Sequence, residues 1–565
     1  MRGRFVGSVS KMASSISKFL HAVGPRLQAQ FDRAAEDTRA SQRNLLLGLL
    51  HRNRNTTYGL KYQFASISSE LEYQKRVPIV QYSDIAPLVE EVKAGKTGVL
   101  TTEPAKMFAI TSGTTAEPKY IPITRRGHRL TEQLTRLWLY RAVADHPAAA
   151  WEKWLFITGA ACEGHTTGEI PFGNFSGMMQ SALPARFRKL RAVPDAVLDI
   201  ADYKLRMYLI ARFAIASEVS LIVSPNPLTL AKLLQTITSS ADSIISAVHH
   251  GWLTDSIRNE NEAKEAGISP EIYRLLQPNP QLARGLRSIL EKSEELAAVD
   301  LWPNLALLGC WLGGSIGYHA AALDLGYKKI PRRDIGYLAS EGFFTLSSND
   351  DSPAGPLALN GTYFEFIPLE EEDKSDPHVL MVGEVELGQS YKLVITNENG
   401  LYRYYLDDIV KVESRYFHAP VVSFLQKGSS MLNISGEKLH LNHLLFAMEK
   451  VRQLLAVDIR QFRAAPNIQK LRYELFLDIG TGTVNADRLR ATLDAALSEC
   501  NLEYRSRRRS DRLGLPCVHF MSEKWEENMR HHDLKTGKRE AQYKWPHLVS
   551  EIRPEDCTYV IQTIE

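Results

Sequence analysis

The spacing of apolar residues changes along the chain, and each pattern predicts a different kind of structure. Residues 12–100 carry apolar positions at helical spacing, with a break at 57–59, where Thr, Tyr and Gly stand together. From about residue 105, short apolar runs alternate with longer amphipathic stretches. This alternation predicts an α/β fold with largely parallel sheets. The short runs are 107–110, 154–157, 219–223 and 305–308, and 228–237 is one of the helical stretches between them.

Residues 361–415 have a different pattern, with strand-like runs and no helical stretch between them. The runs at 363–367, 391–396 and 408–412 are rich in aromatic and branched residues. Residues 397–400, Asn-Glu-Asn-Gly, lie between the second and third runs and are typical of a turn. This part of the chain is predicted to form a hairpin or a small β-barrel.

The C-terminal part has the pattern of a compact α+β module. A chain of 565 residues is too long for one core, since single cores stop growing at roughly 250–300 residues. We therefore predict a large N-terminal domain at 1–426 and a smaller C-terminal domain at 427–565. The second domain is expected to contain a helix at 442–455, a strand at 471–479, a helix at 486–498 and a strand at 517–521.

Composition and charge restrict the classes of function. The hydrophobic fraction is 44% and the charged fraction 24%, as in ordinary globular proteins. A net charge of +3 indicates no general attraction to nucleic acid or to an anionic membrane. No signal peptide and no apolar run long enough for a membrane span is recognised. The five cysteines are widely spaced without C-x-x-C, so neither a disulfide framework nor a structural zinc site is expected, and a cytoplasmic location fits best.

The segment 111–119 combines small hydroxyl residues, a glycine and a lysine directly after a predicted strand. Its hydroxyl and backbone N–H donors, together with one cation, suit the charge of a polyphosphate. The Walker A pattern is absent. The alternative is a polar surface turn that leads into a strand at 120–124. The candidate phosphate contacts are Ser112, Gly113, Thr114, Thr115 and Lys119.

The segment 336–342, Gly-Tyr-Leu-Ala-Ser-Glu-Gly, contains three further candidates. Tyr337 can stack on a nucleobase, and Glu341 can offer an oxygen ligand to Mg²⁺. Ser340 stands between them and is assigned to the same nucleotide. The alternative is a buried tyrosine followed by a helix whose N-cap is Ser340.

The segment 400–408 ends an aromatic run with two acids. Asp408 could accept hydrogen bonds from both ribose hydroxyls, and Arg403 could make a two-point contact with a phosphate or carboxylate. The alternative is a hairpin with cross-strand aromatic residues and solvated charges. Residues 428–438 contain Gly and Ser and could form a hinge, although composition alone favours a simple linker.

The order of these segments resembles the adenylate-forming superfamily of acyl-CoA synthetases, luciferases and peptide-synthetase adenylation domains. The motifs are S-G-T-T-x-x-P-K, Y-x-x-S-E, Y-R-x-x-x-x-D and G-E-K. Within this superfamily, the chain is similar to the acyl acid–amido synthetases of the auxin-responsive Gretchen Hagen family, from about residue 40 to about residue 550. The segments that point to this family are 57–59, 76–80, 119–122, 302–305, 363–368, 400–404 and 542–546, with Asn501, Tyr504 and Arg508 at the family spacing.

The resemblance implies a two-step reaction with ATP and Mg²⁺. ATP and a small carboxylic acid would give an acyl-adenylate and pyrophosphate, and an amino acid would then attack the acyl carbon to form an amide. The resemblance also implies a C-terminal domain that moves about a hinge at Lys427 and Gly428. By position, Ser112, Thr114, Thr115 and Lys119 would contact phosphates, Tyr337 adenine, Glu341 Mg²⁺ and Asp408 the ribose, with Arg403 close to the same nucleotide.

The resemblance also implies a lysine on the mobile domain that neutralises the α-phosphate. Lys544 is the candidate and Lys538 the rival.

Two residues depart from the family pattern. Ala116 stands where the superfamily usually has Gly after S-G-T-T, and Asp407 stands where Gly usually precedes the ribose Asp. If Asp407 points to the other side of its strand from Asp408, it is expected to be solvated.

Other functions remain as alternatives. A related enzyme would use the same adenylate but transfer the acyl group to a thiol such as coenzyme A. A serine hydrolase is suggested by G-x-S-x-G at 313–317, with Ser315 as nucleophile between the strand at 305–308 and a helix at 318–325. We assign Gly314 and Ser315 instead to a Gly-rich turn under the acyl or adenine pocket. A non-catalytic binding module is a third class.

The acyl pocket is expected to draw on residues 158–179 and 224–226. These segments mix aromatic side chains such as Phe172 and Phe175 with polar groups such as His165. An apolar lining with a few polar groups suits an aromatic or a short aliphatic acid. The sequence alone does not choose between these acids, and it does not identify the amine.

Overall fold

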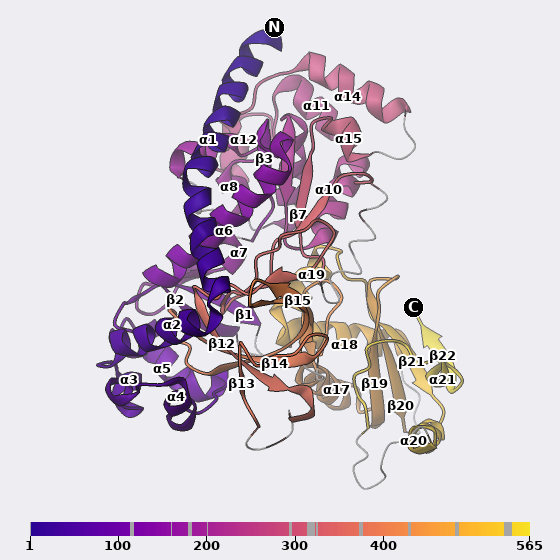
Figure 1. The fold of residues 1–565 in the computed structure, drawn as a ribbon. Helices are drawn as coiled ribbons and strands as arrows, with labels where there is room; N and C mark the ends of the chain where they lie inside the picture. The colour runs from indigo at the N-terminus through magenta and orange to yellow at the C-terminus, as the bar shows by residue number, and fades with distance from the viewer. Residues whose placement is uncertain are drawn as a thin grey trace. The chain divides into compact units, whose positions relative to one another are not determined.

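The computed structural model divides the chain into two compact units (Figure 1). The first unit comprises Met1–Thr111 and Tyr120–Gln426, and the second comprises Ser112–Lys119 and Lys427–Glu565. Movement of the C-terminal part as a domain stays a prediction. The structure describes residues 2–112, 118–159, 161–178, 184–200, 202–292, 297–313, 323, 326–371, 374, 377–427, 431–480, 485–535 and 545–565.

The first unit begins with helices, as the apolar spacing predicts. The first helix, α1, packs against α6, and Ile16, Leu20 and Phe31 share a core with Trp138. The break predicted at 57–59 is wrong in detail, because Thr56 caps a short helix there by accepting a hydrogen bond from Gly59 N at 2.9 Å. The helices are α1 (Arg2–Glu36), α2 (Thr38–Asn53), α3 (Thr57–Lys61), α4 (Glu70–Arg76), α5 (Tyr82–Lys93) and α6 (Arg125–Asp145).

A four-stranded parallel sheet forms the centre of the α/β part, and it confirms the predicted fold class. The run at 219–223 is fully buried, as expected for a strand covered on both faces. The strand predicted at 305–308 lies two residues further along. In sheet order the strands are β3 (Lys153–Phe156), β6 (Val219–Val223), β7 (Leu307–Cys310) and β8 (Arg332–Asp334).

Helices supply the apolar core around this sheet. The side chains of Trp302, Leu230 and Ile222 lie in one buried cluster. The helical stretch predicted at 228–237 corresponds to α10. The helices of this region are α7 (Phe175–Met178), α8 (Asp195–Leu198), α9 (Tyr203–Ile215), α10 (Pro227–Ser239), α11 (Ala241–His250), α12 (Glu260–Glu265), α13 (Pro270–Arg274), α14 (Pro280–Lys292) and α15 (Ala298–Leu301).

A six-stranded sheet occupies the region for which a hairpin or small barrel was predicted. Strands β12, β14 and β15 pair antiparallel, and the predicted turn at 397–400 connects β14 with the segment before β15. In sheet order the strands are β11 (Gly355–Pro356), β16 (Ala419–Lys427), β15 (Tyr404–Tyr416), β14 (Ser390–Asn397), β12 (Thr362–Pro368) and β13 (Leu380–Met381).

The other strands described before residue 427 form two smaller sheets. The first has the order β2–β1–β5–β4, and β1 pairs in parallel with β5. The second is the hairpin of β9 and β10. Their bounds are β1 (Ala105–Ser112), β2 (Pro118–Thr124), β4 (Gly164–His165), β5 (Pro171–Gly173), β9 (Leu338–Ala339) and β10 (Gly342–Phe343).

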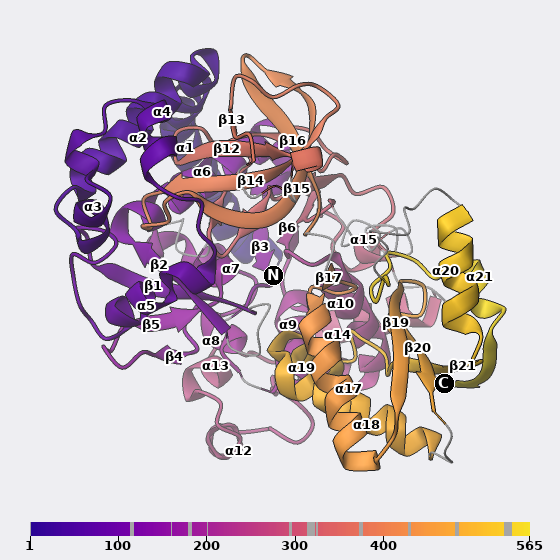
Figure 2. The same cartoon turned by 90° about the horizontal axis from the view of Figure 1, so that it is seen from below.

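The second unit is built on a sheet in the order β19–β20–β21–β22. Helices α17 and α18 cover one face, and α20 lies on the other (Figure 2). The elements are β17 (Met431–Leu432), β18 (Leu439–His440), α17 (Leu441–Leu455), β19 (Ile459–Asn467), β20 (Arg472–Ile479), α18 (Ala486–Cys500), α19 (Leu502–Arg509), β21 (Cys517–Met521), α20 (Trp525–Lys535), α21 (Pro554–Cys557) and β22 (Val560–Ile564). In the described part of the chain, no helix is long and apolar enough to cross a membrane.

Candidate functional site

Tyr337 lies just beyond the carboxyl end of β8, at the edge where ligands bind in parallel α/β sheets. The turn before it depends on Gly336, which has a φ of 93°, in the left-handed region that favours glycine. A Cβ at this position would meet the carbonyl oxygen of Thr345 at 2.3 Å. The backbone N–H of Tyr337 donates to Thr345 Oγ1 at 2.8 Å. The backbone therefore holds Tyr337 in one position.

The carboxylate of Asp334 connects this turn to the end of the neighbouring strand β7. It accepts hydrogen bonds from Leu312 N and from Gly336 N, each at 2.6 Å. Burial raises the pKa of Asp334 to about 7, although both backbone donors act in the opposite direction. Asp334 is thus a buried acid that organises the turn preceding Tyr337. The pattern of Asp two residues before Gly is a turn signal that could have identified it.

Asp334 is expected to make stability depend on pH. Between pH 3.8 and about 7, the folded protein holds a proton on Asp334 that the unfolded chain has released. Stability should therefore fall as pH rises through this range. Asp334→Asn should flatten the slope, because Asn does not titrate. Urea-unfolding midpoints of both proteins across this range provide the test, and parallel slopes would contradict the assignment.

Tyr337 and Asp408 meet in the structure, although 71 positions separate them in the sequence. The phenol of Tyr337 donates a hydrogen bond to Asp408 Oδ2, and both side chains are buried. Burial raises the pKa of Tyr337 well above its usual value, and the charge of Asp408 adds to the shift. The phenol therefore keeps its proton and acts as the donor. Two residues that were assigned to one nucleotide from separate motifs are brought together.

The ring of Tyr337 packs against other aromatic residues. It stacks on Phe424 with ring centroids 5.3 Å apart and an interplanar angle of 29°. Phe344 contacts it at 5.0 Å in a tilted arrangement. A base could stack on the face that Phe424 covers only after Phe424 has moved. Phe424 was not among the predicted residues, because an aromatic residue in a strand is most often a core residue.

Ser340 and Glu341 form the turn of the hairpin between β9 and β10. The alternative interpretation of Ser340 as a helix N-cap is therefore wrong. Ser340 Oγ donates to the carbonyl of Ile110 at 3.3 Å, which connects the hairpin to the end of β1. The carbonyl of Glu341 accepts from Asn397 Nδ2 at 2.9 Å, and the residue is buried. Glu341 thus lies in the same buried region as Tyr337, and its charge contributes to the raised pKa of that phenol.

Arg403 is committed to a structural ion pair. Its Nε donates to both carboxylate oxygens of Glu365 at 3.1 Å, and the side chains are 6% and 0% exposed. Its Nη1 donates to the carbonyls of Gln74 and Val77, each at 2.8 Å. The predicted two-point contact is made with a carboxylate, and that carboxylate belongs to Glu365 of the protein itself. We therefore do not include Arg403 in the nucleotide site.

Asp407 pairs with a buried lysine, whereas Asp408 contacts Tyr337. Lys392 Nζ donates to Asp407 Oδ1 at 2.6 Å, and the side chains are 0% and 39% exposed. Asp407 has a φ of 58°, which explains why a glycine suits this position. Asp tolerates the left-handed region better than most residues. The expectation that Asp407 is solvated holds in part, because its side chain is 39% exposed but is also ion-paired.

Several predicted residues cannot be placed in this site. Ser112 is the last residue of β1 and Lys119 the second of β2, but both fall in the second unit, so no geometry relates them to Tyr337. The remaining predictions lie outside the described residues. They are Gly113, Thr114, Thr115 and Ala116 of the phosphate loop, Gly314 and Ser315 of the Gly-rich turn, and Lys538 and Lys544 near the C-terminus.

Three segments of the chain match the domains of one family. The GH3 family N-terminal domain matches residues 27–331, the central domain 355–427 and the C-terminal domain 442–552. Jasmonoyl–L-amino acid synthetase JAR4 of Nicotiana attenuata is 25% identical over 463 residues, 78% of each chain. Jasmonoyl–L-amino acid synthetase GH3.5 of Oryza sativa subsp. japonica is 24% identical over 562 residues, covering 92% of this chain and 94% of its own.

Solved structures agree at the level of the fold. AtGH3.15 acyl acid amido synthetase in complex with 2,4-DB superposes with a TM-score of 0.65, at 20% identity and covering 95% of this chain and 96% of that one. The predicted resemblance to the auxin-responsive family and the predicted α/β architecture are confirmed. Since the N-terminal domain match alone spans more than half of the sequence, the chain belongs to the GH3 family.

Proposed function

We propose that this protein is an AMP-forming ligase that joins a carboxylic acid to an amino acid through an acyl-adenylate. Family membership supports the proposal, because the similar proteins are named as amido synthetases. Besides the jasmonoyl synthetases, they include Indole-3-acetic acid-amido synthetase GH3.10 and 4-substituted benzoates-glutamate ligase GH3.12, both of Arabidopsis thaliana. These names describe ligases with different acids, so they support the reaction type more strongly than any one substrate.

The contact between Tyr337 and Asp408 carries the proposal. Each residue was assigned to ATP from its own motif, and the two side chains share one hydrogen bond in a buried site. A carboxylate can accept hydrogen bonds from both hydroxyls of a ribose. Tyr337 holds Asp408 in place through its phenol, and a base could stack on its ring once Phe424 has moved from that face. Nucleotide binding beside Asp408 is what this arrangement supports best.

The buried acids also fit the magnesium ion expected with ATP. Glu341 offers carboxylate oxygens, which Mg²⁺ prefers, close to the turn that carries Tyr337. When bound, Mg²⁺ would neutralise charge on the phosphates. Glu341 would hold the ion, and Asp408 would orient the ribose. Ser112, Gly113, Thr114, Thr115 and Lys119 are proposed to bind the phosphates, and Lys544, rather than Lys538, to neutralise the α-phosphate.

The acid is proposed to be aromatic or short and aliphatic, and it would bind at the carboxyl end of the parallel sheet. Ser224 follows β6 directly, and its N–H donates to the carbonyl of Gly309 on β7 at 2.9 Å. In the other segment predicted to line the pocket, residues 158–179, Phe175 is buried and His165 is exposed. An apolar wall with few polar groups suits such acids. The acceptor is proposed to be an amino acid.

A screen of pyrophosphate and AMP release tests the proposal. The purified protein would be incubated with ATP, Mg²⁺ and single acids, each with no acceptor, with each amino acid, or with coenzyme A. We expect turnover to need both an acid and an amino acid, with an amide found by mass spectrometry. Turnover with coenzyme A instead would indicate a thioester-forming ligase. Labelling of Ser315 by a fluorophosphonate, without nucleotide turnover, would indicate a hydrolase.

A further inference from the structure

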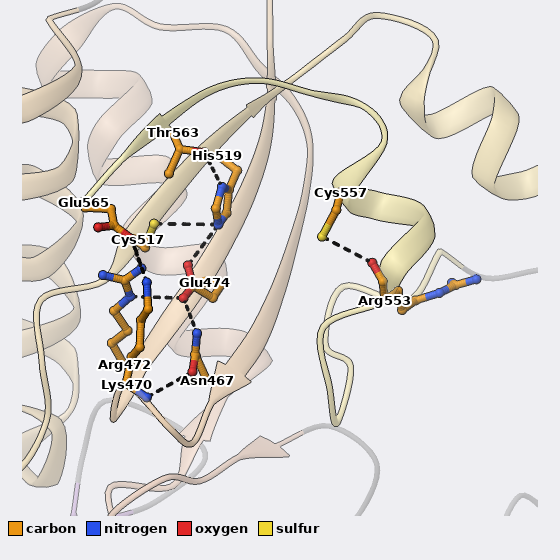
Figure 3. A network of polar contacts seen from close by, with 10 residues as sticks. All are labelled: Asn467, Lys470, Arg472, Glu474, Cys517, His519, Arg553, Cys557, Thr563 and Glu565. Carbon is orange, nitrogen blue, oxygen red and sulfur yellow. Dashed lines mark hydrogen bonds and ion pairs between the residues drawn. The ribbon is translucent and has the colours of Figure 1, made fainter.

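Three side chains with metal-binding atoms converge on one face of the sheet in the second unit (Figure 3). Glu474 on β20 stands opposite Cys517 on β21, and His519 comes two residues later on the same face. His519 Nε2 lies 2.9 Å from Glu474 Oε2 and 3.7 Å from Cys517 Sγ. The three donor atoms lie within 4.8 Å of one another.

This spacing matches that of a tetrahedral zinc site. With Zn–S near 2.3 Å and Zn–N or Zn–O near 2.0–2.1 Å, neighbouring ligand atoms are about 3.3 Å apart for N and O and about 3.6 Å for S and N. The observed separations differ from these by a few tenths of an ångström. Thiolate and imidazole are ligands that select zinc over magnesium or calcium. We propose that Glu474, Cys517 and His519 bind one Zn²⁺ ion.

Surrounding residues hold two of the three ligands, Glu474 and His519, in orientation. Glu474 Oε1, the oxygen turned away from His519, accepts from Asn467 Nδ2 at 2.7 Å and from Arg472 Nε at 3.0 Å. His519 Nδ1 lies 2.9 Å from Thr563 Oγ1 on β22, and its ring stacks on Phe476 at 4.7 Å. Metal-bound histidines use their second nitrogen in this way. Glu474 Oε2 and His519 Nε2, which contact each other at 2.9 Å, are thus the atoms that would turn to the proposed ion.

The charges near the site are compatible with a cation. Arg472 also donates to Glu565 Oε1 at 2.8 Å, and Lys470 contacts the same oxygen at 2.8 Å, so Glu565 balances part of their positive charge. The carboxylate and the thiolate formed on binding would neutralise Zn²⁺. Glu474 and Cys517 are buried, whereas the His519 side chain is 16% exposed. A solvent molecule could therefore provide the fourth ligand beside His519.

The same geometry argues against a nucleophilic cysteine. In a catalytic triad, the nucleophile and the acid contact opposite nitrogens of the histidine. Here Cys517 Sγ and the Glu474 carboxylate both face Nε2. His519 cannot pass a proton from one to the other along its ring. The sequence did not reveal the site, because it has no C-x-x-C and its glutamate is 43 positions from the cysteine.

Zinc and cobalt binding to the full-length protein tests the proposal. After removal of metal with a chelator, the protein would receive ZnCl₂ or CoCl₂ alone and then be desalted. We expect one equivalent of zinc by mass spectrometry and, with cobalt, the charge-transfer absorption of a Co²⁺–thiolate bond. Cys517→Ser should abolish that absorption. Thr563→Val, which leaves all three ligands in place, should weaken zinc binding about 10–100-fold.

Cys557 provides a matched control, because it is an exposed cysteine of the same unit whose thiol donates to the Arg553 carbonyl. Cys557→Ser should keep the cobalt absorption and the zinc equivalent. Circular dichroism would establish that each variant is folded. Absence of a thiolate band in the wild-type protein would overturn the proposal without any variant. A band that persists in Cys517→Ser, or disappears in Cys557→Ser, would overturn it as well.

Discussion

Replacement of Asp408 by Ala is expected to lower acid-dependent ATP–pyrophosphate exchange by about 100-fold or more. The proposed role of Asp408 is to accept two hydrogen bonds from the ribose, and a hydrogen bond to a charged group contributes about 1.5–3 kcal/mol. Two such bonds correspond to a decrease of at least two orders of magnitude in kcat/KM for ATP. The effect should appear already in the first half-reaction, before any amine is added.

Two companion variants make this test specific. Glu413→Gln removes another carboxylate of β15, one that accepts from Ser423 Oγ at 2.7 Å, and it should leave exchange unchanged. Tyr337→Phe keeps the ring but removes the hydroxyl group that donates to Asp408. It should therefore lower ATP–pyrophosphate exchange by less than Asp408→Ala does. Near wild-type exchange in a folded Asp408→Ala protein would contradict the ribose role and, with it, the observation that carries the proposed function.

Replacement of Arg403 by Ala is expected to have the largest effect on stability. It removes the guanidinium from a buried ion pair and leaves the carboxylate of Glu365, which is 0% exposed, without that partner. Removing one partner of a buried ion pair lowers the free energy of unfolding by about 3–5 kcal/mol. The carbonyls of Gln74 and Val77 also lose a donor. The midpoint of urea unfolding should fall markedly, and at low temperature any surviving folded protein should still bind ATP.

The double variant Arg403→Met, Glu365→Met separates the cost of an unpaired charge from the cost of lost packing. Since neither charge remains, it should recover most of the stability that Arg403→Ala loses. The exposed pair of Lys411 and Glu413 offers a contrast, because Lys411→Ala should change stability by no more than about 1 kcal/mol. If Arg403→Ala unfolds like the wild type but no longer binds ATP, Arg403 is a nucleotide ligand after all.

Local sequence patterns predicted three of the four strands of the parallel sheet to within two residues, and they predicted helices α10, α17 and α18. The run at 219–223 is apolar at every position but one, and it forms β6 with those bounds. Strand β19 was missed because it contains Arg463 and Pro466, which argue against a strand in isolation. In the fold, Arg463 is buried against Asp556 and lies over the ring of Trp545 at 4.2 Å. Asp556 is 93 positions away and Trp545 comes only 11 residues before it, so both partners are beyond the reach of any local pattern.

The candidate site was predicted as residue types, but its internal contacts were not. Tyr337 and Glu341 were identified from one motif and Asp408 from another, while the hydrogen bond between Tyr337 and Asp408 results from packing of the segment between β8 and β9 against β15. Arg403 illustrates the opposite case. Its position beside the ribose motif indicated a ligand, but the partner that decides its role is Glu365, on a strand 38 residues earlier.

The pair of Lys392 and Asp407 has an evolutionary consequence. Gly at 407 would relieve a left-handed backbone conformation but would remove the carboxylate that contacts a buried ammonium. An apolar residue at 392 would remove the ammonium while leaving the strained aspartate. Each single substitution is therefore expected to destabilise the fold more than the double substitution does. Such non-additivity between contacting residues is epistasis.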